Sequence, residues 1–372
     1  MIYKIFNKKG YFVYYRSDVM ANLNDVIQLI RGLSSRDKKK LLKIVGNELT
    51  TSNKSMKAFL TEERFKTSRV CPHCSDVAVV KNGHRNDKDY TQKYFCKGCK
   101  KSFTITTNAI VFGTRKDIAI WKEYIECMLN GWSVRKCAEE CNIHRNTAFR
   151  WRHKILDALT NIMKNVSLDG IVEADEKYFP KSYKGNHRGN PKHKHTKAPF
   201  MIPRRTHVRG GMTEKRGISS EQVCVPCAVN KDGQSVAMPV KMGKPIPKAI
   251  HKAFDGRITS NSILCTDGEK SYVKFAADNK IKLVQIKGGK GKVDEYHIQH
   301  INNYHSILDN FISNFKGVST KYLGNYIVWN NIVKYAHERY DEKAEIMFGY
   351  SVSYRMKERN VDISKRPVLP VL

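Results

Sequence analysis

Hydrophobic positions recur differently in successive parts of the chain. Residues 22–58 and 116–163 place apolar side chains mostly three and four positions apart, which predicts helices in both parts. Between them, residues 69–106 carry short strand-like runs separated by turn residues such as Asn82-Gly83. From residue 166 onward, strand-like runs alternate with helical stretches, a pattern typical of an α/β domain. The predicted strands of this last part are 170–174, 222–230, 235–239, 262–266 and 282–286.

Two further segments lack this periodicity. Residues 1–19 precede Met20, where a better domain start follows, so we expect them to be a loosely attached leader. Residues 181–218 are rich in Lys, Arg, His, Gly and Pro and contain a single acid, Glu214, which predicts an extended basic loop between the first two strands. A charge run is usually a solvated surface. The place of this one, shortly after Asp175, favours an arm that contacts a polyanion.

Composition points to the same kind of partner. The chain has 372 residues, of which 41% are hydrophobic, enough for two or three domains with real cores. Lys and Arg total 67 against 35 acids, a net charge of +32, which favours nucleic acid because phosphate neutralisation releases counterions. A membrane surface is the competing partner, but no apolar stretch approaches the roughly 20 residues of a span.

The cysteine content indicates a reducing compartment. The N-terminal residues lack the apolar core and the cleavage site of a signal peptide. Ten cysteines in such a chain are expected to stay reduced, as in a cytoplasm.

Four of these cysteines form two Cys-x-x-Cys pairs, Cys71/Cys74 and Cys96/Cys99. Two such knuckles at this separation converge four thiolates on one tetrahedral Zn²⁺, and the residues between them supply the strands of a zinc ribbon. A closed site of four thiolates is structural, because no position is left for a substrate. The alternative is four ordinary thiols or redox pairs, which the paired spacing disfavours.

The other Cys-x-x-Cys pair has a different interpretation. Cys224 and Cys227 lie inside a strand-like run, so we expect core positions. Cys127, Cys137 and Cys141 lie at apolar positions of predicted helices and are expected to pack in the same way.

Residues 133–152 fit a helix-turn-helix. Ala138 is the small residue where two helices would cross, and Asn142 lies at the turn, where a left-handed backbone is required. Ala148 and Trp151 are expected to face the core. The basic outer face of the second helix favours DNA contact in a major groove over a purely structural hairpin. The residues predicted to face outward are Arg145, Asn146, Arg150 and Arg152.

Candidate catalytic residues lie at the ends of predicted strands. Asp175 and Asp267 each follow a buried apolar run, and a polar helix-like stretch containing Asn302 follows later. Two strand-end carboxylates and a later helix side chain are the means by which RNase H-like folds hold two divalent ions for phosphodiester chemistry. We therefore predict a site for two Mg²⁺ or Mn²⁺ ions at Asp175 and Asp267.

The residues alone do not decide the identity of the third metal ligand. Asn302, Asn303, Glu295 and Asp309 are all within reach of the closing helix. Asn302, His305 and Asp309 share a helix face because they are three and seven positions apart. Strand alternation turns Glu176 away from Asp175, so Glu176 is a secondary candidate together with His305 and Asp309. Glu269 lies close to Asp267 in the same way.

The order of these parts resembles a family of bacterial insertion-sequence transposases, the zinc-ribbon-bearing relatives of the eukaryotic Merlin transposases. The resemblance covers about residues 25–335 and includes several motifs in the right order. They are Gly170-Ile171-Val172-Glu173-Ala174-Asp175-Glu176, residues 216–223, Thr266-Asp267-Gly268, residues 297–306 and residues 315–323.

The resemblance implies a transposase of the DDE class, which nicks DNA at element ends and joins the freed 3′-OH to target DNA. Asp175 and Asp267 match the two catalytic aspartates, and Asn302 matches the third position, as in the Asp-Asp-Asn branch. The implied partners are the terminal inverted repeats of the element, target DNA and a second copy of the chain, in the bacterial cytoplasm at the nucleoid. Lys184, Arg188, Arg204 and Arg205 are expected to contact DNA.

One position departs from the family. Relatives usually carry Lys seven positions after the third ligand, where this chain has Asp309. Two hypotheses therefore compete with an active transposase. An impaired copy would act only as a sequence-specific DNA-binding protein. A structure-selective nuclease is disfavoured by the separate sequence-reading module.

The predicted organisation has six parts. They are a leader (1–19), a helical segment (20–60), a zinc ribbon (61–112), a helix-turn-helix (113–165), an α/β RNase H-like catalytic domain (166–335) with the basic insertion 181–218, and a C-terminal tail (336–372).

Overall fold

The computed structural model describes residues 2–6, 12–16, 30–34, 37–38, 56–86, 91–182, 184, 217–286, 291–335, 340–353, 356 and 359–367. It divides into two compact units, Met1–Phe59 and Leu60–Leu372. In the first unit, β1 (Ile2–Phe6) pairs antiparallel with β2 (Phe12–Arg16), so the predicted leader contains a hairpin that its pattern did not indicate. Most of the helix predicted over residues 22–58 lies outside the described residues.

The second unit begins with a small antiparallel sheet. Its strands are β3 (Val79–His84), β4 (Gln92–Cys96) and β5 (Ser102–Phe103), in that order. Tyr94 of β4 stacks on Phe103 of β5 at 5.6 Å between ring centroids. Phe65, directly after the helical residues 56–64, packs edge-on against Tyr94 at 5.0 Å, and these rings form the apolar centre of the segment.

Three helices follow, α3 (Ala119–Leu129), α4 (Val134–Glu140) and α5 (Arg145–Lys164). The side chain of Ser133 caps α4 by accepting a hydrogen bond from the Lys136 N–H. Asn142 has a φ of 46°, the left-handed conformation predicted for the turn between α4 and α5. Ala148 and Trp151 are buried as expected, and Trp151 stacks on Trp121 at 3.8 Å.

The prediction for the orientation of Arg152 was wrong. It was expected to face outward, but it is fully buried, and its guanidinium donates to the Trp132 carbonyl oxygen at 2.7 Å. The same group contacts the Cys137 Sγ at 3.2 Å and lies 4.5 Å from the centre of the Trp329 ring. The helical period places residue 152 near the same face as Ala148, and aromatic and sulfur partners there accept the cation.

The α/β part is built on one mixed sheet. Its strands are β6 (Ile171–Pro180), β7 (Gln222–Asn230), β8 (Ser235–Ala237), β9 (Lys241–Met242), β10 (Ile263–Thr266) and β11 (Lys282–Gln285). The order is β11-β10-β6-β7-β8, with β9 paired to β7. The strands β6, β7 and β8 pair antiparallel, whereas β10 and β11 run parallel to β6. This order is typical of the RNase H-like fold predicted for the segment, and each predicted strand is present.

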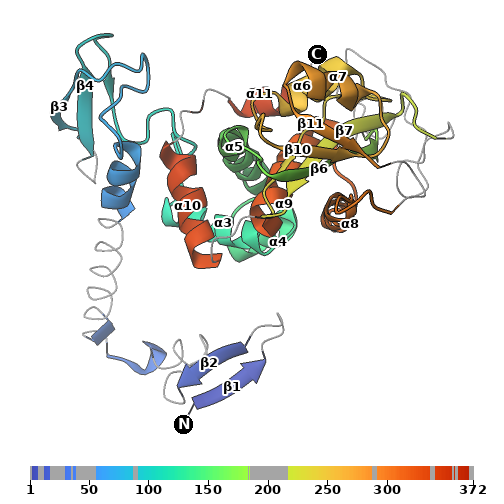
Figure 1. The fold of residues 1–372 in the computed structure, drawn as a ribbon. Helices are drawn as coiled ribbons and strands as arrows, with labels where there is room; N and C mark the ends of the chain where they lie inside the picture. Colours follow the sequence, from blue (N-terminus) through green and yellow to red (C-terminus); the bar gives the residue numbers. More distant parts are fainter. Residues whose placement is uncertain are drawn as a thin grey trace, which may run out of the picture. The chain divides into compact units, whose positions relative to one another are not determined.

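Helices cover both faces of this sheet (Figure 1). On one face, α6 (Pro247–Phe254) and α7 (Ser271–Asp278) close an apolar core that includes Val172 and Ala174 of β6. On the other face, α8 (Gln299–Ser313) lies against β6 and β7. Because side chains alternate along a strand, β6 presents Val172 and Ala174 to the core, and Glu173, Asp175 and Lys177 to α8.

The C-terminal helices join the two halves of the second unit. They are α9 (Leu323–Tyr335), α10 (Tyr340–Ser353) and α11 (Asn360–Lys365). The indole N–H of Trp329 on α9 donates to the Met128 carbonyl oxygen of α3 at 2.9 Å. Arg366, just after α11, donates to both carboxylate oxygens of Asp157 on α5 at 2.8 and 2.7 Å. The predicted tail therefore includes helices that pack on the helical part.

Cysteine packing agrees with the sequence. Cys127, Cys137, Cys141, Cys224 and Cys227 are all buried, as expected of core residues. Among the described residues, no helix is long and apolar enough to cross a membrane.

We expect His153 to contribute to the pH dependence of stability. Burial, followed by the positive charges of Arg366 and Arg152, holds the pKa of His153 well below its usual value, so the ring is neutral in the folded protein. Below its ordinary pKa of about 6.5 only the unfolded chain binds this proton. Stability is therefore lost as the pH falls, at about 1.4 kcal/mol per pH unit.

His153→Phe keeps the ring contact with Tyr322 and removes the titration. Urea unfolding at neutral pH and at about pH 5.5 should show a shallower loss of free energy in the variant than in the wild type. Equal losses in the two proteins would contradict the buried neutral ring.

Candidate active site and metal centres

Asp267 follows the end of β10, as predicted, but Asp175 lies in the middle of β6 and not after a strand end, because β6 continues to Pro180 through its pairing with β7. The two aspartates lie at the point where the pairing of β6 with β10 stops. The strands β6 and β10 are parallel neighbours in which Ala174 pairs with Thr266, so Asp175 and Asp267 are the next pair along. A backbone N–H holds each carboxylate. Asp175 Oδ1 accepts from the Glu176 N–H at 2.8 Å, and Asp267 Oδ1 accepts from the Glu269 N–H at 3.0 Å. The structure thus brings together the two aspartates that the sequence singled out.

The carboxylates at this site carry like charges and repel one another. Burial, followed by the negative charge of Asp267, raises the pKa of Asp175 to about 6, although the Glu176 N–H and Lys177 lower it. Burial also raises the pKa of Glu176 to about 8, with further contributions from Asp175 and Asp267. Carboxylates held together in this way release free energy when a cation binds between them.

The acidic residues of β6 lie on opposite faces of the sheet. Glu173, Asp175 and Lys177 alternate along one face, toward α8, whereas Glu176 lies on the other face beside Tyr272 of α7. The sequence predicted that Glu176 turns away from Asp175, and the structure has this arrangement.

The helix α8 matches the polar face of β6 residue by residue. His300 lies beside Glu173, His305 beside Asp175, and Asp309 beside Lys177. Four or five helical residues rise about 6–7 Å, the same as two strand residues, so a helix parallel to β6 keeps this register. The register determines which α8 side chains can reach the aspartates.

His305 is the α8 residue that reaches Asp175. Its Nδ1 lies 3.8 Å from Asp175 Oδ2, and its side chain is 11% exposed. Burial, followed by the positive charge of Lys177, lowers the pKa of His305 to about 4, so the ring is neutral at neutral pH. The buried Nε2 has no hydrogen-bond partner among the described residues. A neutral imidazole in this position can bind a metal ion or orient the Asp175 carboxylate.

The candidate third ligands on α8 lie on its exposed side. Asn302 and Asn303 are exposed, and among the described residues no hydrogen bond joins the Asn302 side chain to either aspartate. Glu295, before α8, is exposed as well. The role of Asn302 as third ligand stays a prediction.

Asp309 pairs with a residue that the sequence argument missed. Its carboxylate forms a salt bridge with the Lys177 ammonium, and the two side chains are 49% and 24% exposed. Lys177 also lowers the pKa of Asp175. The negative charge at position 309 is therefore neutralised by a lysine that β6 supplies, and it does not face the aspartates alone. Residues 173, 175 and 177 alternate along β6, but the predicted strand ended at residue 174, and extending it to residue 177 is the signal that could have indicated Lys177.

The predicted DNA contacts fall into three groups. Arg145, Asn146 and Arg150 are exposed on α5, as expected, whereas Arg152 is buried. Lys184 has partners within the chain, since its ammonium donates to the carbonyl oxygens of residues 315, 316 and 317 at 2.5, 3.0 and 2.7 Å, and its contact with DNA stays a prediction. These bonds use all three donors of a lysine. Outside the described residues lie Arg188, Arg204 and Arg205.

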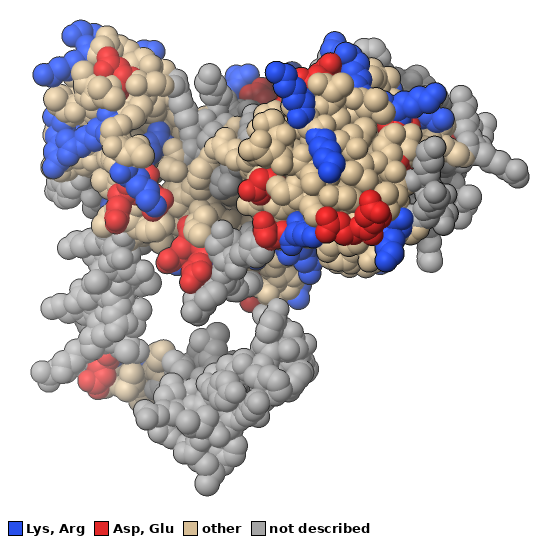
Figure 2. Space-filling model, in the orientation of Figure 1, with Lys and Arg blue, Asp and Glu red and all other residues tan. Residues whose placement is uncertain are grey.

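Basic side chains are unevenly distributed on the face that Figure 2 shows. Figure 2 shows Lys and Arg gathered over the region of β3 and β4, whereas the α/β part shows acidic side chains among the basic ones on the same side. The basic insertion predicted at residues 181–218 lies mostly outside the described residues.

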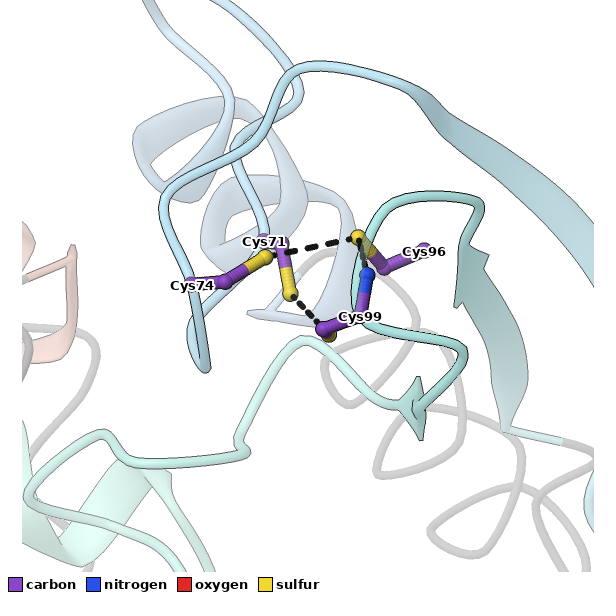
Figure 3. A group of neighbouring side chains, drawn as sticks. All are labelled: Cys71, Cys74, Cys96 and Cys99. Atoms are coloured by element: carbon purple, nitrogen blue, oxygen red, sulfur yellow. Dashed lines mark hydrogen bonds between the residues drawn. The ribbon is translucent and has the colours of Figure 1, made fainter.

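Four cysteines form a second centre. The Sγ atoms of Cys71, Cys74, Cys96 and Cys99 all lie within 4.8 Å of one another and point inward (Figure 3). Two of the sulfur–sulfur distances are 3.7 Å, between Cys71 and Cys99, and 3.6 Å, between Cys74 and Cys96. Tetrahedral Zn²⁺ with bonds of about 2.3 Å places its sulfurs about 3.8 Å apart, so the cluster fits this ion.

The two knuckles share one backbone geometry. The Cys71 N–H donates to the Asp76 carbonyl oxygen at 2.9 Å, and the Cys96 N–H donates to the Lys101 carbonyl oxygen at 3.0 Å. The residue after the second cysteine of each pair is left-handed, with φ values of 68° at Ser75 and 56° at Lys100. The thiols therefore converge because two equivalent turns aim them inward.

Loss of one thiol should release one metal ion. Cys74→Ser is expected to lower the zinc content by one ion per chain, since three thiolates and a hydroxyl bind Zn²⁺ much more weakly. Residues 71–103 should then exchange their amide hydrogens faster, because the cluster connects both knuckles. The measurements are elemental analysis and hydrogen exchange. Cys127→Ala, outside the cluster, is the control that should keep the metal; retention of zinc by Cys74→Ser would contradict the assignment.

The chain is similar to two solved structures, and one segment of it matches a protein family. Crystal structures of a pre-cleavage Mos1 transpososome and of the Mos1 strand transfer complex are each 10% identical to this chain, with TM-scores of 0.20 and 0.21. They cover 65% and 63% of this chain and 80% and 78% of theirs. No curated protein sequence matches the chain. Residues 167–329, which include Asp175, Asp267 and α8, match the ISXO2-like transposase domain family.

Proposed function

We propose that this protein is a DNA transposase that binds the ends of its element and carries out metal-dependent nicking and strand transfer. The observation that carries the proposal is that Asp175 and Asp267 directly follow the last paired residues of β6 and β10, Ala174 and Thr266, within residues that match a transposase domain. Phosphodiester transfer needs such paired oxygen ligands.

The chain's own residues would divide the work. Asp175, Asp267 and Asn302 would hold two Mg²⁺ or Mn²⁺ ions, and bound ions of this kind activate the attacking oxygen and stabilise the leaving oxygen. His305, neutral and 3.8 Å from Asp175, would orient that carboxylate. Burial, followed by the negative charge of Asp267, raises the pKa of Asp175, and a bound cation would offset both effects.

DNA recognition would lie in the helical part. Arg145, Asn146 and Arg150 are exposed near the start of α5, where a recognition helix contacts base edges. The zinc ribbon would stabilise the adjoining segment and add phosphate contacts. The terminal inverted repeats and target DNA would be the partners, and bringing two ends together would require at least two copies of the chain.

The first test is strand transfer by the purified full-length protein with Mg²⁺ or Mn²⁺ and labelled element ends. Wild type should join these ends to target DNA, and Asp267→Asn should lower joining by several orders of magnitude while end binding persists, since the amide keeps the shape but removes a charged metal ligand. Asp278→Asn, at an exposed position at the end of α7, is the matched control and should stay active. End binding by wild type without joining in either metal would reassign the protein to the class of DNA-binding proteins.

The Lys177–Asp309 pair gives a second test. Asp309→Lys should reduce joining, because it places two ammonium groups together beside Asp175. The double variant Lys177→Asp/Asp309→Lys, which exchanges the charges, should recover part of the activity. Strand-transfer rates of the wild type, Lys177→Asp, Asp309→Lys and the double variant form a double-mutant cycle. A gain of activity in Asp309→Lys alone would show instead that Asp309 impairs the enzyme.

A further inference from the structure

Glu173 connects β6 to the start of α8. Its side chain is 3% exposed, and its Oε2 accepts hydrogen bonds from the N–H groups of His300 and Ile301 at 2.8 and 3.1 Å. These two bonds fix the carboxylate in place. The other oxygen, Oε1, is left facing two imidazole rings.

Both rings present the same atom to that oxygen. His300 Nδ1 lies 2.5 Å and His297 Nδ1 lies 3.1 Å from Glu173 Oε1. The His297 Nδ1 also accepts a hydrogen bond from the Gln299 N–H at 3.3 Å. This nitrogen has a single lone pair, so an ion bound between His297 and Glu173 would replace the contact with Gln299. A cation there would offset the negative charge of the buried Glu173 carboxylate.

We propose that Glu173, His297 and His300 form a binding site for a transition-metal ion of the zinc class. The three ligand atoms lie within 4.8 Å of one another. Zn²⁺ with bonds of about 2.0 Å places its ligand atoms about 3.3 Å apart, close to the distance from Glu173 to His297. His300 is 48% exposed, so its ring can turn outward by the small amount that the ion requires.

The ligand set selects the metal. Two imidazoles and one carboxylate favour Zn²⁺, Co²⁺ or Ni²⁺ over Mg²⁺, which prefers oxygen ligands. Three protein ligands leave one coordination position open toward solvent. This centre is distinct from the Asp175–Asp267 edge, although Glu173 is two residues before Asp175 on the same face of β6. A bound ion would fasten the start of α8 to that strand.

The test is a Co²⁺ titration of the full-length protein in an Asp267→Asn background, which weakens the oxygen site. Two ions per chain are expected. One, at the four cysteines, gives intense thiolate charge-transfer absorption, and the other gives only weak visible bands, as nitrogen and oxygen ligands do.

Adding His300→Gln to this background should remove the second ion and leave the thiolate absorption unchanged. The matched control is His251→Gln, because His251 also pairs with two carboxylates, Asp255 and Asp278, but through different ring nitrogens. His297→Gln provides an independent second variant. Binding of cobalt at the thiolates only, or a second ion that persists in both His300→Gln and His297→Gln, would overturn the proposal. The result does not depend on strand-transfer activity.

Discussion

The pairing of β6 with β10 is the constraint on which the polar site depends. Two free carboxylates in water repel each other. The backbone hydrogen bonds between β6 and β10 hold Asp175 and Asp267 next to each other in spite of this repulsion. The apolar face of β6, packed under α6 and α7, fixes the strand from the other side. The repulsion among the acids is thus balanced by core packing on the opposite face of the same strand, and a cation can use the free energy stored in that repulsion.

Buried polar groups connect the helical part with the α/β part. Arg152 on α5 lies against Trp329 of α9, and Asp157 receives two bonds from Arg366. A buried guanidinium is tolerated here because a carbonyl oxygen, a thiol and an aromatic face surround it. These contacts make α5 part of a core that also includes α9.

Period and spacing in the sequence were sufficient for much of the fold. Strand-like runs located β7 within its observed bounds, and paired cysteines indicated the four-thiol cluster. The incorrect predictions concern side-chain contacts between residues that are distant in the sequence. A guanidinium such as Arg152 looks exposed in a helical pattern because the carbonyl, sulfur and ring that bury it come from distant positions. The Lys177–Asp309 and Glu173–His300 contacts were missed for the same reason, since they depend on the register between α8 and β6.

The junction of β6 and β7 determines how freely this chain can change in length. The two strands pair as far as Pro180 and Gln222, and the Lys181 N–H donates to the Glu221 carbonyl oxygen at 2.9 Å beyond them. A segment whose two ends are joined in this way leaves and re-enters the sheet at one point. A change in the number of residues between 184 and 217 therefore leaves the pairing of β6 with β7 in place, which makes this junction a natural place for new specificity to evolve.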